Sequence, residues 1–131
     1  MAAKATRESF GETILEVAEK DPRLVVLDAD LSKSTMTQAF MKKHPARHFE
    51  VGIAEQNMVG MAAGLALSGK VPVLTSFACF LIGRVESIRV SAAYNQTNMK
   101  LVGTHAGIGI GEDGTSQMGL EDVAPCAPCR T

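Results

Sequence analysis

The sequence predicts an α/β fold in which a parallel sheet is flanked by helices. Short apolar runs rich in Val, Leu and Ile recur along the 131 residues and alternate with segments whose apolar residues repeat at helical spacing. This alternation indicates strand–helix–strand units, and such units form parallel sheets with right-handed crossovers. Acidic residues, aromatic residues or a Gly-rich segment directly follow the apolar runs, at the edge where parallel sheets bind ligands.

The first half of the chain is expected to form helices over residues 6–20, 36–43 and 55–67 and strands over residues 24–27 and 49–51. The pair Asp21-Pro22 stops the first helix, and His44-Pro45 separates the second helix from the strand that follows it. Leu24–Leu27 is continuously apolar, which is typical of a strand buried on both faces. Gly69 ends the third helix, because Gly readily adopts the left-handed conformation of a helix cap.

The second half is expected to form strands over 71–75 and 100–104, a helix over 81–94 and the start of another helix over 120–124. Pro72 has no N–H group, so it belongs at the start of its strand. The segment 105–118 holds four glycines and almost no periodicity. Loops of this length inside a compact domain are usually functional.

Composition limits the classes of partner and the location. With 46% hydrophobic and 21% charged residues, the chain has the size and composition of one soluble domain. A formal net charge of −1 and no basic run longer than two residues argue against nucleic acid. Neither a membrane span of about 20 apolar residues nor an apolar leader is present, so we expect a cytoplasmic protein without a membrane partner.

No metal site is expected. Cys126 and Cys129 have C-x-x-C spacing at a Pro-rich end of the sequence, but no second Cys or His pair completes a zinc site. His44, His48 and His105 do not form a metal triad either, because only one of them follows a predicted strand.

Side chains from four segments are expected to meet at the carboxyl edge of the sheet: Asp28 and Asp30, Glu55, Phe77 and Phe80, and residues 105–117. Each also has a structural explanation. The helix dipole stabilises an acid in a first turn by about 0.3–1 kcal/mol, and aromatic residues in apolar runs are usually core. The segment 109–114 partly imitates a dinucleotide fingerprint, but it opens no helix and its two acids would repel a pyrophosphate. We therefore predict a ligand pocket that is not a nucleotide site.

Four motifs in a fixed order extend this prediction: Ile53-Ala-Glu-Gln-Asn-Met58, Ser76-Phe-Ala-Cys-Phe80, Thr104-His105, and Gly111-Glu-Asp-Gly-Thr-Ser-Gln-Met-Gly-Leu-Glu-Asp-Val123. Together they resemble the pyrimidine-binding domain of transketolases, which use thiamine diphosphate. The resemblance covers about Ser9 to Ala124. It implies a pyrimidine-binding domain over residues 1–124 that is incomplete at its C-terminus, followed by an unmatched tail over residues 125–131.

The resemblance implies a cofactor role for four residues. Glu55 matches the glutamate that hydrogen-bonds N1′ of the cofactor's aminopyrimidine, so it is both catalytic and cofactor-binding. Phe77 and Phe80 match aromatic residues that pack on this ring. Asp30 matches an acid near the thiazolium side.

Three further residues match the channel that holds the sugar. His105 and Asp113 correspond to residues that line this channel, and we expect His105 to be catalytic as well as substrate-binding. At the position of Gln117, many microbial and plant transketolases carry His, whereas the animal-type enzymes carry Gln, as this sequence does. Gln can hydrogen-bond a sugar hydroxyl but cannot act as a general base.

The implied activity is transfer of a two-carbon ketol unit from a ketose to an aldose, often as phosphorylated sugars, in the pentose phosphate pathway. The family holds the cofactor's diphosphate and its Mg²⁺ in a separate domain through a Gly-Asp-Gly motif, which this sequence lacks. A diphosphate-binding domain or subunit is therefore an expected partner, in a homo- or hetero-oligomer such as a dimer. Two alternatives stay open: a fragment of a deoxyxylulose-phosphate synthase, and a non-catalytic domain that only pairs with a partner.

Overall fold

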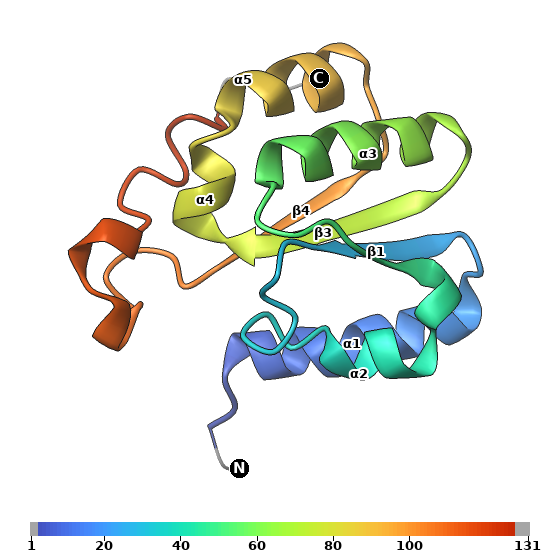
Figure 1. Cartoon of the computed structure of the whole chain (residues 1–131), viewed down its shortest axis with the longest axis horizontal. Coiled ribbons are helices and arrows are strands. Elements are labelled where there is room, and N and C mark those ends of the chain that lie inside the picture. Colours follow the sequence, from blue (N-terminus) through green and yellow to red (C-terminus); the bar gives the residue numbers. More distant parts are fainter. Residues whose placement is uncertain (1–2, 128–131) are drawn as a thin grey trace.

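The structure, a computed structural model, describes residues 3–127. Its helices are α1 (Thr6–Lys20), α2 (Gln38–Lys43), α3 (Glu55–Leu67), α4 (Ala78–Ile82) and α5 (Val85–Ser87), with the π-helix η2 (Ile88–Tyr94) and the 3₁₀ turns η1 (Pro45–Arg47), η3 (Gly111–Asp113) and η4 (Thr115–Gln117). Its strands are β1 (Leu24–Asp28), β2 (His48–Glu50), β3 (Val71–Phe77) and β4 (Lys100–Thr104). All described strand pairs are parallel, in the order β2-β1-β3-β4 (Figure 1). The predicted α/β fold is confirmed.

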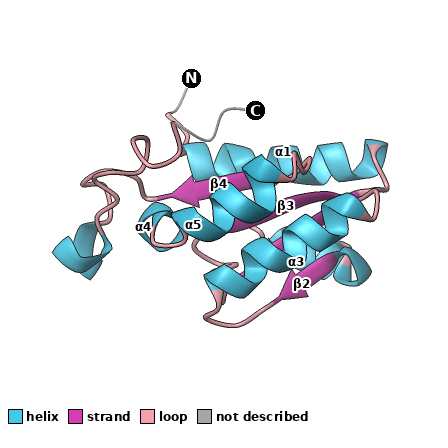
Figure 2. Cartoon of the chain, turned by 90° about the horizontal axis from the view of Figure 1, so that it is seen from above, coloured by secondary structure: helices cyan, strands magenta, loops and turns pink. Residues whose placement is uncertain are grey.

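Helices cover both faces of the sheet. α1 and α2 lie on one face, and α3 to α5 lie on the other (Figures 1 and 2). Alternate residues of β1 serve the two faces, because Val25 and Leu27 join the core under α3 whereas Leu24 and Val26 join the core under α1. This double burial explains why the β1 run is apolar without interruption.

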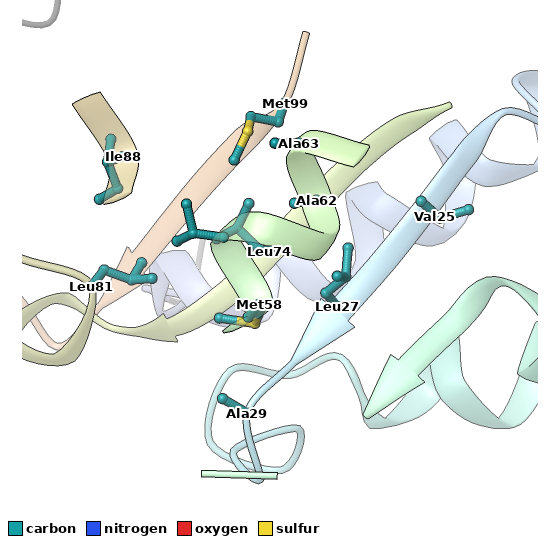
Figure 3. Packing of buried hydrophobic residues seen from close by; sticks show 11 residues of the cluster. Val25, Leu27, Ala29, Met58, Ala62, Ala63, Leu74, Leu81, Ile88 and Met99 are labelled. Carbon is teal, nitrogen blue, oxygen red and sulfur yellow. The ribbon is translucent and has the colours of Figure 1, made fainter. Parts of the chain in front are cut away.

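The core under α3 fixes where that helix begins. Figure 3 shows Met58 and Ala62 of α3 lying over Leu27 of β1 and Leu74 of β3. Met58 is fully buried and lies one turn after Glu55, the first residue of the helix. Packing of this first turn therefore holds Glu55 at the carboxyl edge of the sheet.

Three predicted elements differ from the structure. No helix forms over residues 120–124, which lie in turns, because Pro125 disfavours helical backbone in the residue before it. The helix expected over 81–94 begins at Ala78 and is divided into α4, α5 and η2, with Gly83, a weak helix former, at the first break. The helix expected over 36–43 begins at Gln38, because Met36 has a φ of +64° that no right-handed helix accepts.

None of the helices in the described part of the chain combines the length and the apolar character that a membrane span requires.

Candidate functional site

A cavity of about 830 Å³ lies at the carboxyl ends of β3 and β4. Its walls come from the start of α1, the end of β4 and the Gly-rich loop after β4. α1 contributes because helices of such a fold run antiparallel to the strands and so begin at the edge where the strands end. Figure 1 shows the start of α1 and the arrowheads of β3 and β4 on the same side of the molecule.

His105 is the central side chain of this cavity. Its ring centroid lies 4.3 Å from that of Phe77. Its Nε2 lies 2.7 Å from Arg7 Nη1, and its Nδ1 lies 2.9 Å from the Thr104 hydroxyl. A guanidinium only donates hydrogen bonds, so Nε2 accepts and the network assigns the proton of the neutral ring to Nδ1. The backbone of His105 has a φ of +55°, a strained conformation of the kind that gathers at functional sites.

The surroundings keep this imidazole neutral. Burial lowers the pKa of His105, and the positive charge of Arg7 lowers it further, while the negative charge of Asp113 opposes both effects. At neutral pH, His105 is therefore a hydrogen-bonding group with a basic Nε2 rather than a cation.

Glu55 lies outside this cavity, buried under the start of α3. Its side chain is buried, with 5% exposure, and its Oε1 accepts a hydrogen bond of 3.1 Å from the Ser76 hydroxyl. No salt bridge to Glu55 occurs within residues 3–127. Burial raises the pKa of the nearby Cys79 thiol, and the negative charge of Glu55 adds to this rise. Glu55 is thus a buried carboxylate whose described polar partner is a single hydroxyl.

The end of β3 separates the buried Glu55 from the cavity around His105. Successive side chains of a strand point to opposite faces, and Ser76 contacts Glu55 of α3 whereas Phe77 lines the cavity beside α1. The Phe77 ring stacks on that of Phe80 in α4, with centroids 5.6 Å apart and an interplanar angle of 15°. Phe77 is buried and Phe80 is half-buried, so Phe80 offers ring surface to a flat ligand.

The remaining predicted residues are only partly brought together. Asp113, at the end of η3, lines the cavity with His105. Gln117 is half-buried in η4 and does not line it. Asp30 is exposed in the loop after β1 and lies outside it.

Asp28, which was expected to face the ligand crevice, is instead fully buried inside the fold. Its carboxylate accepts hydrogen bonds from the hydroxyls of Thr35, Thr37 and Thr75 and from the backbone N–H of Leu31. These donors stabilise a buried charge without a cation, so Asp28 is a structural residue that anchors the loop between β1 and α2.

Arg7 and Ser34 line the cavity, although the sequence did not single them out. Arg7 is the only Lys or Arg among the described residues that line it. Arg7 lies on the polar face of an amphipathic helix, where ordinary surface residues also lie. Its position in the sequence therefore did not indicate that it lines a cavity. The available signal was topological, since the first turn of a helix that precedes a buried parallel strand lies at the carboxyl edge of the sheet.

No cluster of three or more His, Cys, Asp or Glu side chains that could hold a metal ion occurs in the part of the chain that the structure describes. Cys129 lies outside the described residues. The predicted absence of a metal site at Cys126 and Cys129 therefore stays a prediction.

The buried Glu55 and the cavity around His105 suit different chemical groups. A buried carboxyl group with one hydroxyl partner fits a flat nitrogen heterocycle that shares a proton with it, and the lack of a paired cation among the described residues disfavours a phosphate there. The cavity around His105 has one guanidinium, a neutral imidazole, three hydroxyl side chains and the two acids Glu112 and Asp113, so it fits a polyhydroxylated ligand.

Comparisons with known proteins agree with this arrangement. Residues 2–130 match the family described as the transketolase pyrimidine binding domain. A putative transketolase C-terminal section from Methanocaldococcus jannaschii is 53% identical over 122 residues, which make up 92% of this chain and 39% of that protein. Human transketolase is 43% identical over 121 residues, 92% of this chain and 19% of that protein. A solved structure of a split gene transketolase, described as an inactive beta4 tetramer, matches with a TM-score of 0.80 and 46% identity, over 95% of this chain and 40% of that one.

Proposed function

Since the chain belongs to the family of transketolase pyrimidine-binding domains, we propose that it is one part of an enzyme that transfers a two-carbon ketol unit between sugars with thiamine diphosphate. The chain spans about two fifths of the Methanocaldococcus jannaschii relative and about one fifth of human transketolase. Because the chain covers only this part of its relatives, the activity of the whole enzyme is a proposal that rests on the site. The observation that carries the proposal is the buried Glu55 side chain, whose Oε1 accepts a hydrogen bond from Ser76 at the end of β3. The next residue of that strand, Phe77, stacks on Phe80.

Glu55 has the chemistry that the aminopyrimidine of the cofactor requires. When bound, thiamine diphosphate supplies the nucleophilic carbon that accepts the ketol unit. Glu55 holds a proton between its carboxyl group and the ring nitrogen N1′. Ser76 fixes the orientation of Oε1, and the low exposure of the site excludes water from the proton-sharing pair. Phe80 supplies ring surface for the pyrimidine, with Phe77 behind it.

The cavity around His105 binds the sugar. Arg7 pairs with a substrate phosphate, because a guanidinium binds phosphate oxygens in a bidentate fork, and its charge partly offsets those of Glu112 and Asp113 in the same lining. Asp113 and Ser34 line the same cavity and bind sugar hydroxyls, and the basic Nε2 of His105 accepts a proton or a hydrogen bond from one of them. Gln117 and Asp30 lie outside the cavity, so their proposed roles, toward a sugar hydroxyl and the thiazolium side, need contacts that a partner or the ligand completes.

A partner must supply the diphosphate site and its Mg²⁺. One exposed face of α3 supports such a partner, because Gly60 and Gly64 face open space and Ile53, just before the helix, is 85% exposed. This face begins beside Glu55, where a diphosphate-binding domain has to approach. The similar split gene transketolase is an inactive beta4 tetramer, which supports an oligomer that needs another subunit for activity. A place in the pentose phosphate pathway, a cytoplasmic location and a dimeric core complete the proposal.

The test is reconstitution of the chain with a diphosphate-binding transketolase subunit. We expect ketol transfer from a ketose phosphate to an aldose phosphate only in the mixture. The Glu55→Ala variant should lose at least about 10²-fold in turnover, a typical contribution of positioned proton transfer. Glu16→Ala, at an exposed position on α1, is the matched control and should keep full activity.

Three results would contradict the proposal. Unchanged turnover in the Glu55→Ala complex would remove Glu55 from the chemistry. Consumption of pyruvate with release of carbon dioxide would favour the deoxyxylulose-phosphate synthase alternative. Absence of cofactor binding with any diphosphate-binding partner would favour a non-catalytic pairing domain.

A further inference from the structure

Glu50 joins the loop that carries Asp30 to the loop that leads into α3 and its first residue, Glu55. It is the last residue of β2, and its side chain is exposed. A single oxygen, Oε1, accepts the backbone N–H of Asp30 at 2.8 Å and that of Gly52 at 2.9 Å. Asp30 belongs to the loop after β1, and Gly52 belongs to the loop that leads into α3. One carboxylate oxygen therefore bridges two segments that the sequence separates by more than twenty positions.

The bridge holds backbone in an unusual conformation. Asp30 has a φ of +61° and Gly52 a φ of +71°. A residue with a side chain adopts the left-handed region uncommonly, although Asp does so more readily than most, and the hydrogen bond to Glu50 supports that conformation at Asp30. A Cβ at position 52 would meet no heavy atom within 4 Å, so crowding does not require Gly there. The positive φ explains the Gly, because Gly adopts this conformation without steric cost.

Two acidic side chains hold the turn at Asp30 through successive backbone N–H groups. The N–H of Asp30 donates to Glu50, and the next N–H along the chain, that of Leu31, donates to Oδ1 of the buried Asp28 at 2.9 Å. Sheet register explains the pairing, because Asp28 and Glu50 are partners in the β1–β2 ladder. Asp28 anchors the turn to the fold, and Glu50 links it to the segment that leads to Glu55.

We propose that Glu50 is a positioning residue that fixes the Asp30 turn relative to the start of α3, so that Asp30 and Glu55 keep the spacing that cofactor binding needs. The part of this inference that concerns the cofactor rests on the proposed function. The bridge between the two loops does not, and it can be tested on the full chain alone.

The first experiment measures amide hydrogen exchange by NMR in the full chain and in Glu50→Ala, Glu50→Gln and the control Glu16→Ala. In Glu50→Ala we expect exchange at both Asp30 and Gly52 to rise by about tenfold or more, the effect of losing a hydrogen bond to a charged acceptor. Glu50→Gln keeps an oxygen acceptor in the same place but loses the charge, so its exchange should lie between wild type and Glu50→Ala. Unchanged exchange in Glu50→Ala, or a change at only one of the two amides, would overturn the bridge.

The second experiment uses the reconstituted complex and varies the concentration of thiamine diphosphate. Glu50→Ala should raise the concentration needed for half-maximal activity by several-fold, and Glu50→Gln should restore it in part. Faster exchange with an unchanged cofactor requirement would overturn the positioning role, since Glu50 would then be only a surface contact. A wild-type complex without turnover would count against the proposed function instead, and the exchange result would still decide the bridge.

Discussion

The same substitution, Gly to Ala, should have opposite effects at two helical positions. Gly60 lies inside α3, and a Cβ there would meet no heavy atom within 4 Å. Gly11 lies inside α1, and a Cβ there would lie 2.6 Å from the backbone oxygen of Met36 and 2.8 Å from its Cβ. Ala is favoured over Gly in a helix interior by about 1 kcal/mol, so Gly60→Ala should stabilise the chain by about 0.5–1 kcal/mol.

At Gly11 the helix preference competes with overlap against backbone. Met36 has a φ of +64° in the loop that carries Ser34, so it cannot move aside without shifting the cavity wall. Overpacking costs about 1–3 kcal/mol, which cancels or exceeds the helix gain and leaves Gly11→Ala less stable than wild type by up to about 2 kcal/mol. Urea unfolding measures both variants, with equal m-values confirming a change in stability alone. A Gly11→Ala chain as stable as Gly60→Ala would refute the close contact between α1 and the Met36 loop.

Three further expectations follow from the same geometry. Gly60→Ala should weaken association with a diphosphate-binding partner while stabilising the isolated chain, and unchanged affinity in a sedimentation or calorimetric titration would place the interface elsewhere. Arg7→Gln should raise the pKa of His105, since it removes a positive charge beside the ring; NMR titration of His105 tests this, and an unmoved pKa would contradict the Arg7 contact. Burial lowers the folded-state pKa of both His48 and His105, so the unfolded chain binds more protons and stability should fall as pH drops below about 6.5; a urea midpoint that does not change between pH 7.5 and 5.5 would contradict this.

Much of the fold could be predicted because its strands are buried on both faces. Leu24–Leu27 contains no polar residue, because its side chains pack alternately into two hydrophobic cores. This pattern can be recognised from the sequence alone. The helix from Glu55 to Leu67 was predicted with the bounds that the structure has. The helix expected at 120–124 was wrong, because helical spacing over five residues is weak evidence beside a following proline.

The site was less predictable, since its contacts depend on which way a side chain turns. Asp28 and Asp30 lie at or just after the end of the same strand. Asp28 is buried and accepts hydrogen bonds from three threonine hydroxyls, whereas Asp30 is exposed. The threonines lie up to 47 positions away from Asp28 in the sequence, so no local pattern reveals them. Glu50 likewise gains its role only through sheet register and two backbone donors.

The central claim is that Glu55 exchanges a proton with the pyrimidine of a cofactor whose diphosphate another polypeptide binds. The most direct test compares wild type with Glu55→Gln in the reconstituted complex, because Gln keeps a hydrogen-bonding oxygen but cannot carry the proton. We predict cofactor binding by calorimetry within about tenfold of wild type and turnover reduced by at least about 10²-fold. Turnover equal to that of wild type would contradict the account.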